Sequence, residues 1–171
     1  AGYMSPQELI SIAKEAVNPE NTLENKIAKF EAGEKDPEFL MGLIKNTYSS
    51  DFSLAQKVAT RYFQMRTDAT YSKEEAVMLL FFTKTIDDDL YKIFTAKKAE
   101  LSTQIPESYL AEYDKQLKLN TVLQKSFDAN TQSINEQVFL AEGTKIYGEK
   151  EANQLLNKIN MDLFFTQKKY D

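Results

Sequence analysis

Apolar residues recur at intervals of three and four along most of the chain, which is the spacing of one face of an α-helix. The segment 52–66 shows the pattern well, with apolar side chains at Phe52, Ala55, Val58, Ala59, Tyr62 and Phe63. No segment combines the two-residue alternation of a β-strand with hairpin turns. The pattern therefore predicts an all-α protein of about eight to nine helices.

Three serine-led capping boxes predict helix starts. Serine is followed three residues later by glutamate at residues 5–8, 72–75 and 133–136, so each pair can satisfy two backbone amides at a helix N-terminus. The first helix should stop at residues 18–19, and its apolar face comprises Leu9, Ile12, Ala13 and Ala16. The helix after Ser72 is apolar on much of its circumference, which predicts a central position.

Proline and glycine mark further boundaries. Asp36 before Pro37 predicts a helix start, Gly33 stands where a left-handed residue ends a helix, and Gly148 marks the end of a later helix. The apolar segment 106–127 is either one long helix or two helices joined near its Leu-Asn step.

The segment 39–63 favours an open stack of helices over a closed bundle. It reads as a helix, a tight polar turn and a second helix in which Ala55 and Ala59 precede Tyr62 and Phe63. Small residues let paired helices approach closely, as they do in tetratricopeptide-type hairpins. We therefore expect antiparallel helical hairpins stacked in a right-handed, tetratricopeptide-like array.

Composition removes several classes of chemistry. The 171 residues include no cysteine and no histidine. These absences exclude disulfides, thiolate metal sites, a thiol nucleophile and the commonest neutral-pH base within this sequence. Catalysis would have to use carboxylates, lysines or tyrosines, and all the glycines stand apart from one another, so no glycine-rich phosphate loop is present.

Charge and hydropathy narrow the expected partners. The chain carries 21 basic and 26 acidic residues, and the two signs are interspersed. Nucleic-acid binding depends on clustered cations, so no nucleic-acid partner is predicted. No apolar run approaches the roughly 18 residues of a membrane span, so membrane insertion is not predicted either.

The acidic clusters are interpreted as helix caps. Asp87, Asp88 and Asp89 precede a predicted helix, where acids favour the positive end of the helix dipole. They lack the glycine turn and distal glutamate of a calcium loop. No metal ligand, cofactor site or catalytic residue is assigned. The alternative is a carboxylate- or lysine-based site in which distant acids, such as Asp88 and Glu142, meet in a pocket.

Tyrosines are candidates for a binding surface. An aromatic ring with a hydroxyl suits peptide recognition, although helical spacing also places such residues in a core. The candidates are Tyr48, Tyr62, Tyr91, Tyr109 and Tyr113. A further possibility is dimerisation through the last helix by Leu163 and Phe164.

The opening of the chain resembles part of a known family. Residues 2–10, GYMSPQELI, resemble the end of a thioredoxin fold: a glycine leaving the last strand, a capped turn and the final helix. The stretches NPENT at 18–22 and FEAGEKDPEFL at 30–40 are similar to the helical region after the thioredoxin domain in bacterial envelope thioredoxin-like proteins.

This resemblance implies an organisation and a setting. Residues 1–18 would be the final helix of an upstream thioredoxin-like domain, and residues 19–171 a single helical-hairpin domain in the periplasm or cell envelope. The family's Cys-x-x-Cys and cis-proline loop have no counterpart here, so no catalytic residue is carried over, and any thiol–disulfide exchange would lie upstream of Ala1. The expected function is a non-enzymatic interaction module for a protein or peptide.

Overall fold

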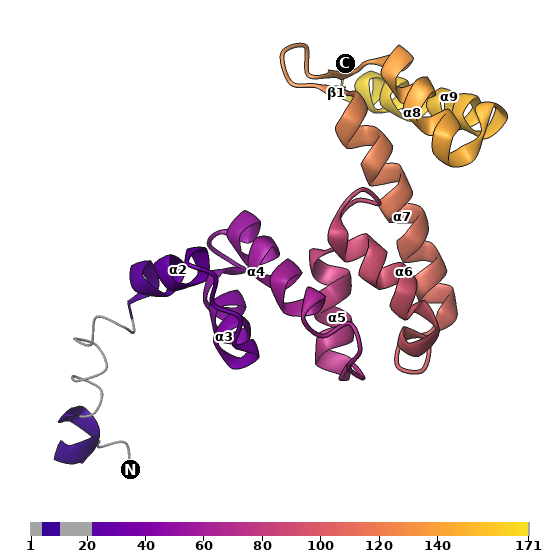
Figure 1. Cartoon of the computed structure of the whole chain (residues 1–171). Helices are drawn as coiled ribbons and strands as arrows, with labels where there is room; N and C mark the ends of the chain where they lie inside the picture. Colours follow the sequence, from indigo (N-terminus) through magenta and orange to yellow (C-terminus); the bar gives the residue numbers. More distant parts are fainter. Residues whose placement is uncertain (1–4, 11–21, 171) are drawn as a thin grey trace. The chain divides into compact units, whose positions relative to one another are not determined.

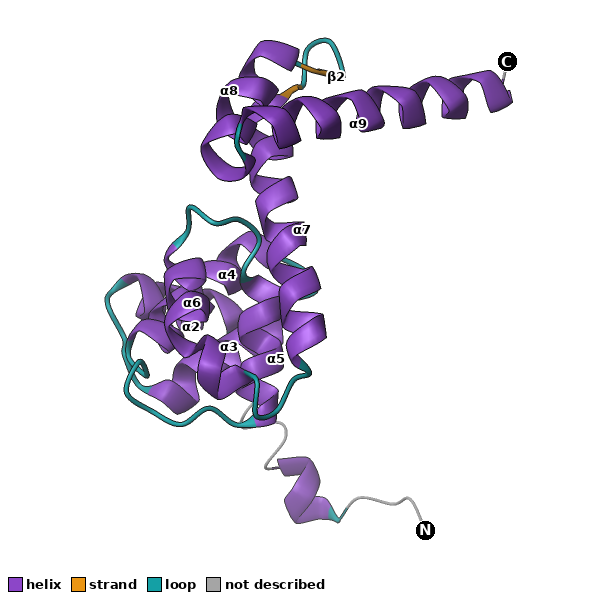
Figure 2. Ribbon diagram, turned by 90° about the vertical axis from the view of Figure 1, so that its right-hand side faces the viewer, coloured by secondary structure: helices purple, strands orange, loops and turns teal. Residues whose placement is uncertain are grey.

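The computed structural model describes residues 5–10 and 22–170, and these are mostly helical (Figures 1 and 2). This confirms the predicted all-α class. Residues 6–10 are helical. The other elements are α2 (Leu23–Glu31), α3 (Pro37–Thr47), α4 (Phe52–Gln64), α5 (Lys73–Phe82), α6 (Asp89–Leu101), α7 (Glu107–Ser126), β1 (Phe127–Asp128), β2 (Ser133–Ile134), α8 (Glu136–Tyr147) and α9 (Glu149–Tyr170).

Two of the three predicted capping boxes are confirmed. The Glu8 amide donates to Ser5 Oγ at 3.2 Å, and the Ser5 amide donates to Glu8 Oε2 at 3.1 Å. Ser72 and Glu75 form the same reciprocal pair at the start of α5. The predicted apolar face at Ile12, Ala13 and Ala16, the stop at residues 18–19 and the proposed domain boundary there lie outside the described residues.

The third predicted box, at residues 133–136, is wrong. The chain reverses after α7, and Ser133 pairs with Asp128 in a short antiparallel hairpin. The Ser133 hydroxyl lies 2.6 Å from Thr131 Oγ1, so it does not cap the helix. Asn135 does so instead, accepting from the Val138 amide at 3.1 Å. Each strand has two residues, which is too short to leave an alternating sequence pattern.

The chain divides into two compact units between Thr70 and Tyr71. Nothing in the sequence pattern indicated this division. The first unit contains α2, α3 and α4, and the second contains the remaining labelled elements. The tetratricopeptide-like stacking stays a prediction.

In the first unit, α3 and α4 pack side by side after a short turn. Ala55 and Ala59 of α4 are fully buried, in keeping with the close helix approach expected of small residues. The core also contains Leu40, Leu43, Ile44, Val58, Tyr62 and Phe63. Gly33 has φ +105° and ends α2 as predicted, because the left-handed region suits glycine.

Arg61 of α4 holds the end of α2. Its guanidinium lies 3.9 Å from the centroid of the Phe30 ring. Arg61 Nη1 also donates to the carbonyls of Phe30, at 2.6 Å, and Glu34, at 3.1 Å. A planar cation can make the stacking contact and the two hydrogen bonds together, which lysine cannot.

We expect Arg61→Lys to lower the free energy of unfolding by about 1–3 kcal/mol, because charged hydrogen bonds and ring stacking are both lost. Urea denaturation followed by circular dichroism measures the change. Lys57→Ala, at an exposed position of the same helix, is the control and should shift stability by less than about 0.5 kcal/mol. Equal losses in the two variants would contradict the role of Arg61.

In the second unit, α7 is one continuous helix of 20 residues, which decides between the two predicted alternatives. Its first eleven residues include the buried Leu110 and Leu117. Its C-terminal half contributes Val122 to a separate cluster with Phe139 of α8 and Leu156 of α9. Phe127, expected on the apolar face of this segment, instead follows the helix and is half exposed.

Helices α8 and α9 approach closely at a glycine. A Cβ atom built on Gly143 would lie 3.1 Å from the Cβ atom of Ala152 and 3.9 Å from a methyl of Val122. Both Gly143 and Ala152 are buried. The absence of a side chain at Gly143 therefore sets the spacing of these two helices.

Gly143→Leu should destabilise the protein by about 1–3 kcal/mol, because the packed helices would have to separate. The matched control is Gly42→Leu in α3, where a Cβ atom meets nothing within 4 Å. That change should be neutral or stabilise by up to about 1 kcal/mol, since leucine favours helix over glycine. Thermal denaturation distinguishes the two. A neutral Gly143→Leu would show that the helices are loosely packed.

Candidate functional site

An open groove lies between α5 and α7 in the second unit, with a volume of about 540 Å³. We call it the α5–α7 groove. One wall comes from α5 and the residues just after it, and the other from α7 and the loop before it. Its apolar lining comprises Val77, Leu80, Phe81, Ile105, Pro106, Tyr109, Tyr113 and Leu117, and its polar lining comprises Lys73, Thr83, Lys84, Gln104, Gln116 and Asn120.

The α5 wall exposes apolar side chains, although the apolar circumference of this helix predicts a central position. Ala76, Leu79 and Phe82 are buried, as a central helix requires. Val77 and Phe81, however, are 52% and 45% exposed. They are four residues apart, so they form one outward stripe along the groove. The expectation that α5 would be enclosed is thus wrong on this face.

The α7 wall is built around two tyrosines. The Tyr113 hydroxyl donates to the carbonyl oxygen of Thr83, at the end of α5, at 2.6 Å. Burial raises the pKa of Tyr113 well above its ordinary value, so the hydroxyl remains a neutral donor. Tyr109, one turn earlier, is 58% exposed. Tyr113 therefore links the two walls, and Tyr109 offers a ring at the groove.

The other predicted tyrosines lie elsewhere. Tyr62 is buried in the core of the first unit, and Tyr48 is exposed there. Tyr91 is partly buried in the second unit, where its hydroxyl donates to Asp114 Oδ1 at 2.9 Å. Of the five candidates, Tyr109 and Tyr113 are the two that line the α5–α7 groove. The apolar circumference of α5 was the sequence signal for the opposite wall.

The groove has cationic ends. Lys73 is the first residue of α5, and Lys84 follows its last turn. Helix α5 is roughly 15 Å long at a rise of 1.5 Å per residue, and Lys84 lies two residues beyond its end, after the extended residue Thr83. Among the described residues that line the groove there is no aspartate or glutamate. Its electrostatic character therefore favours an apolar ligand with acidic groups near its ends.

The three aspartates have separate structural roles. Asp88 caps α6, accepting from the Tyr91 amide at 2.7 Å, as predicted. Burial raises its pKa, and hydrogen bonds from backbone amides partly oppose that rise. Asp89 pairs with Lys92 at 3.7 Å, and Asp87 with Lys125 at 2.5 Å. No group of three or more acids in the described part of the chain is placed to hold a metal ion.

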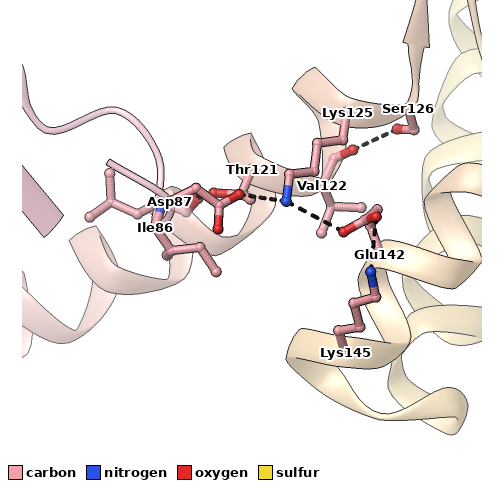
Figure 3. A network of polar contacts seen from close by, with 9 residues as sticks. Ile86, Asp87, Thr121, Val122, Lys125, Ser126, Glu142 and Lys145 are labelled. Carbon is pink, nitrogen blue, oxygen red and sulfur yellow. Dashed lines mark hydrogen bonds and ion pairs between the residues drawn. The ribbon is translucent and has the colours of Figure 1, made fainter. Parts of the chain in front are cut away.

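Asp88 and Glu142 have different partners: Asp88 caps α6, and Glu142 belongs to an ion-pair network. Figure 3 shows Lys125 of α7 between Asp87 and Glu142. Lys125 Nζ lies 3.4 Å from Glu142 Oε2, and Lys145 donates to the other oxygen at 3.2 Å. The hydrogen bond to Asp87 raises the pKa of Lys125, and the one from Lys145 lowers the pKa of Glu142. These are ion-paired surface groups joining α7 to its neighbours.

One carboxylate supports the wall of the groove indirectly. Glu100 accepts from the Tyr71 amide at 2.7 Å and from Lys97 at 3.2 Å. These two bonds, the first above all, lower the pKa of Glu100 below 4.5. The Tyr71 carbonyl in turn accepts from Gln104, which lines the groove, at 2.6 Å.

Glu100 should make stability depend on pH. Because its pKa is lowered in the folded state, its contribution is fully present above pH 4.5 and is lost as the pH falls through the lowered value. The difference in unfolding free energy between the wild type and Glu100→Gln should therefore shrink as the pH falls below 4.5. Urea titrations over that range measure it. A difference that stays constant would contradict the assignment.

No protein-family model, curated protein or solved structure matches this chain. No helix in the described ranges, 5–10 and 22–170, is long and apolar enough to cross a membrane.

Proposed function

We propose that this chain is a non-enzymatic interaction module that binds a polypeptide in the α5–α7 groove. The observation that carries the proposal is the outward stripe of Val77 and Phe81 facing a wall that includes Tyr109. A helix of a folded domain normally turns polar residues to solvent. An exposed apolar strip beside an aromatic ring is typical of grooves that receive the apolar face of a partner helix.

The ligand's chemistry follows from the lining. The apolar floor suits leucine-like side chains at positions i, i+4 and i+7 of an amphipathic helix. Lys73 and Lys84 would attract acidic residues about three turns apart on that helix. Gln104, Gln116 and Asn120 offer hydrogen bonds to the polar edges of the bound segment.

A designed peptide tests the proposal. We expect a helical peptide of about 14 residues, with a leucine stripe and a glutamate near each end, to bind with a Kd of about 1–100 μM. The double variant Val77→Ser, Phe81→Ser should weaken binding at least about tenfold, because it removes the apolar stripe that the peptide would contact. Fluorescence anisotropy of a labelled peptide measures both affinities.

The control pair is Leu23→Ser, Met65→Ser, which changes two exposed apolar residues of the first unit. Its affinity for the peptide should match that of the wild type. A scrambled peptide of the same composition should bind at least about tenfold more weakly. Equal binding of the two peptides, or undiminished binding by the Val77, Phe81 variant, would contradict the groove.

The two lysines should set the charge preference. The double variant Lys73→Glu, Lys84→Glu should bind the glutamate-ended peptide at least about tenfold more weakly than the wild type does. It should bind a lysine-ended version of the peptide more tightly. Lys84 Nζ also lies 5.2 Å from the centroid of the Phe81 ring, so the single variant Lys73→Glu, which leaves that contact in place, should show the same preference to a smaller degree. Salt titration provides a second readout, since added salt should weaken the wild-type complex. Loss of binding to both peptides would instead indicate damage to the groove.

We also propose that the chain follows a thioredoxin-like domain in a bacterial envelope protein. Support comes from the resemblance of residues 2–10 and 30–40 described above, and from the Ser5–Glu8 cap at its start. The groove would then present or recognise a protein substrate for a dithiol upstream. The full reading frame tests this: a Cys-x-x-Cys before Ala1 is expected, and a frame without one would contradict it.

A further inference from the structure

Helices α5, α6 and α7 leave the α5–α7 groove open to solvent. Helix α6 connects the end of α5 to the start of α7 (Figure 1). Among the described residues that line the groove, none belongs to α6. The groove therefore opens on a side of α5 and α7 that α6 does not cover, and the directions of the three helices decide which kind of helix fits there.

Helices α5 and α7 run in the same direction. At their starts, Gln104, just before α7, donates to the carbonyl oxygen of Tyr71, just before α5, at 2.6 Å. At the other end of α5, the hydroxyl of Tyr113 in α7 donates to the carbonyl oxygen of Thr83 at 2.6 Å. The contacts thus follow the same order along both helices, as they do only between parallel neighbours.

Helix α6 runs the opposite way. Near its start, Tyr91 donates to Asp114 of α7 at 2.9 Å. Near its end, Glu100 accepts from the amide of Tyr71, just before α5, at 2.7 Å. The start of α6 therefore lies beside the middle of α7, and its end lies beside the start of α5. Helix α6 is antiparallel to both.

The groove takes the position of a fourth helix. In an up-and-down four-helix bundle each helix is antiparallel to both of its neighbours, so the parallel helices are diagonal partners. Here α5 and α7 are a parallel pair, α6 is one of the two helices between them, and the groove is the remaining place. Tyr113 lines this place, and Asp114 bonds α6. Consecutive helix residues point about 100° apart, so α7 offers adjacent sides to the two.

We propose that the α5–α7 groove receives its partner helix in one direction, antiparallel to α5 and α7, as the fourth helix of this bundle. This inference rests on the proposed function of the groove. The N-terminus of the partner helix would then lie near Lys84, and its C-terminus near Lys73.

Charge favours the same direction. The N-termini of α5 and α7 both lie at the Lys73 end, and each carries the positive pole of a helix dipole. Helix α7 begins after Pro106, and no described side chain caps that end. The last carbonyl groups of α5 bring a negative pole to the Lys84 end. An antiparallel partner helix places its negative C-terminal pole at the more positive end of the groove.

Two peptides that differ in the place of one glutamate test the direction. Both are helical, carry the leucine stripe and have blocked ends. One has its glutamate near the N-terminus and the other near the C-terminus, with glutamine at the opposite position. We expect Lys73→Gln to weaken binding of the C-terminal glutamate peptide about two- to fivefold, because that glutamate would pair with Lys73. Binding of the other peptide should change by less than about 1.5-fold. Fluorescence anisotropy measures the affinities.

Lys115→Gln is the matched control. Lys115 is an exposed residue of α7 that does not line the groove, so both affinities should stay within about 1.5-fold of the wild type. A nitroxide label on the C-terminus of the peptide gives a second readout by nuclear magnetic resonance. It should broaden the amide resonances of Lys73 and Gln104 more than those of Lys84 and Asn120. A label on the N-terminus should do the reverse.

The same loss of affinity for both peptides, a larger loss for the N-terminal glutamate peptide, or equal broadening at both ends of the groove would overturn the proposed direction. If the peptides also lose affinity in the Val77→Ser, Phe81→Ser variant, the groove still binds them and the direction alone fails. Failure of both peptides to bind the wild type would contradict the proposed function of the groove, and the direction with it.

Discussion

The second unit depends on α7 being one uninterrupted helix. Its 20 residues serve two packing sites: Leu110 and Leu117 are buried in its N-terminal part, and Val122 joins Phe139 and Leu156 nearer its C-terminus. A continuous helix fixes the relative rotation of its two ends. The wall of the α5–α7 groove and the cluster beneath α9 are therefore placed by a single element.

The groove arises because α5 has more apolar surface than the core uses. Ala76, Leu79 and Phe82 face inward, and Val77 and Phe81 remain outside. The hydrogen bond from Tyr113 to the Thr83 carbonyl joins the end of α5 to α7 below this stripe. Exposed apolar area costs solubility unless something covers it, and we infer that a partner polypeptide is what covers it.

Local signals in the sequence were sufficient for most helix boundaries. Ser5, Asp36 and Ser72 cap helices as predicted, because a cap depends on residues within one turn. Ser133 failed because pairing with Asp128 across the reversal outweighs its local signal. The groove needs α5 and α7 side by side, and such tertiary pairing leaves no mark in local spacing. Aromatic rings with hydroxyls make Tyr109 and Tyr113 candidates from sequence alone, whereas the apolar circumference of α5 predicts a central helix and so hides the exposure of Val77 and Phe81.

Nuclear magnetic resonance of the isotope-labelled chain tests the central claim most directly. The glutamate-ended leucine-stripe peptide would be titrated into the chain while backbone and methyl resonances are followed. Binding in the α5–α7 groove predicts shifts concentrated at Val77, Phe81 and Tyr109, with intermolecular contacts from the peptide leucines to the methyls of Val77 and the ring of Phe81. Shifts confined to residues outside that groove, or none at millimolar peptide, would contradict the account.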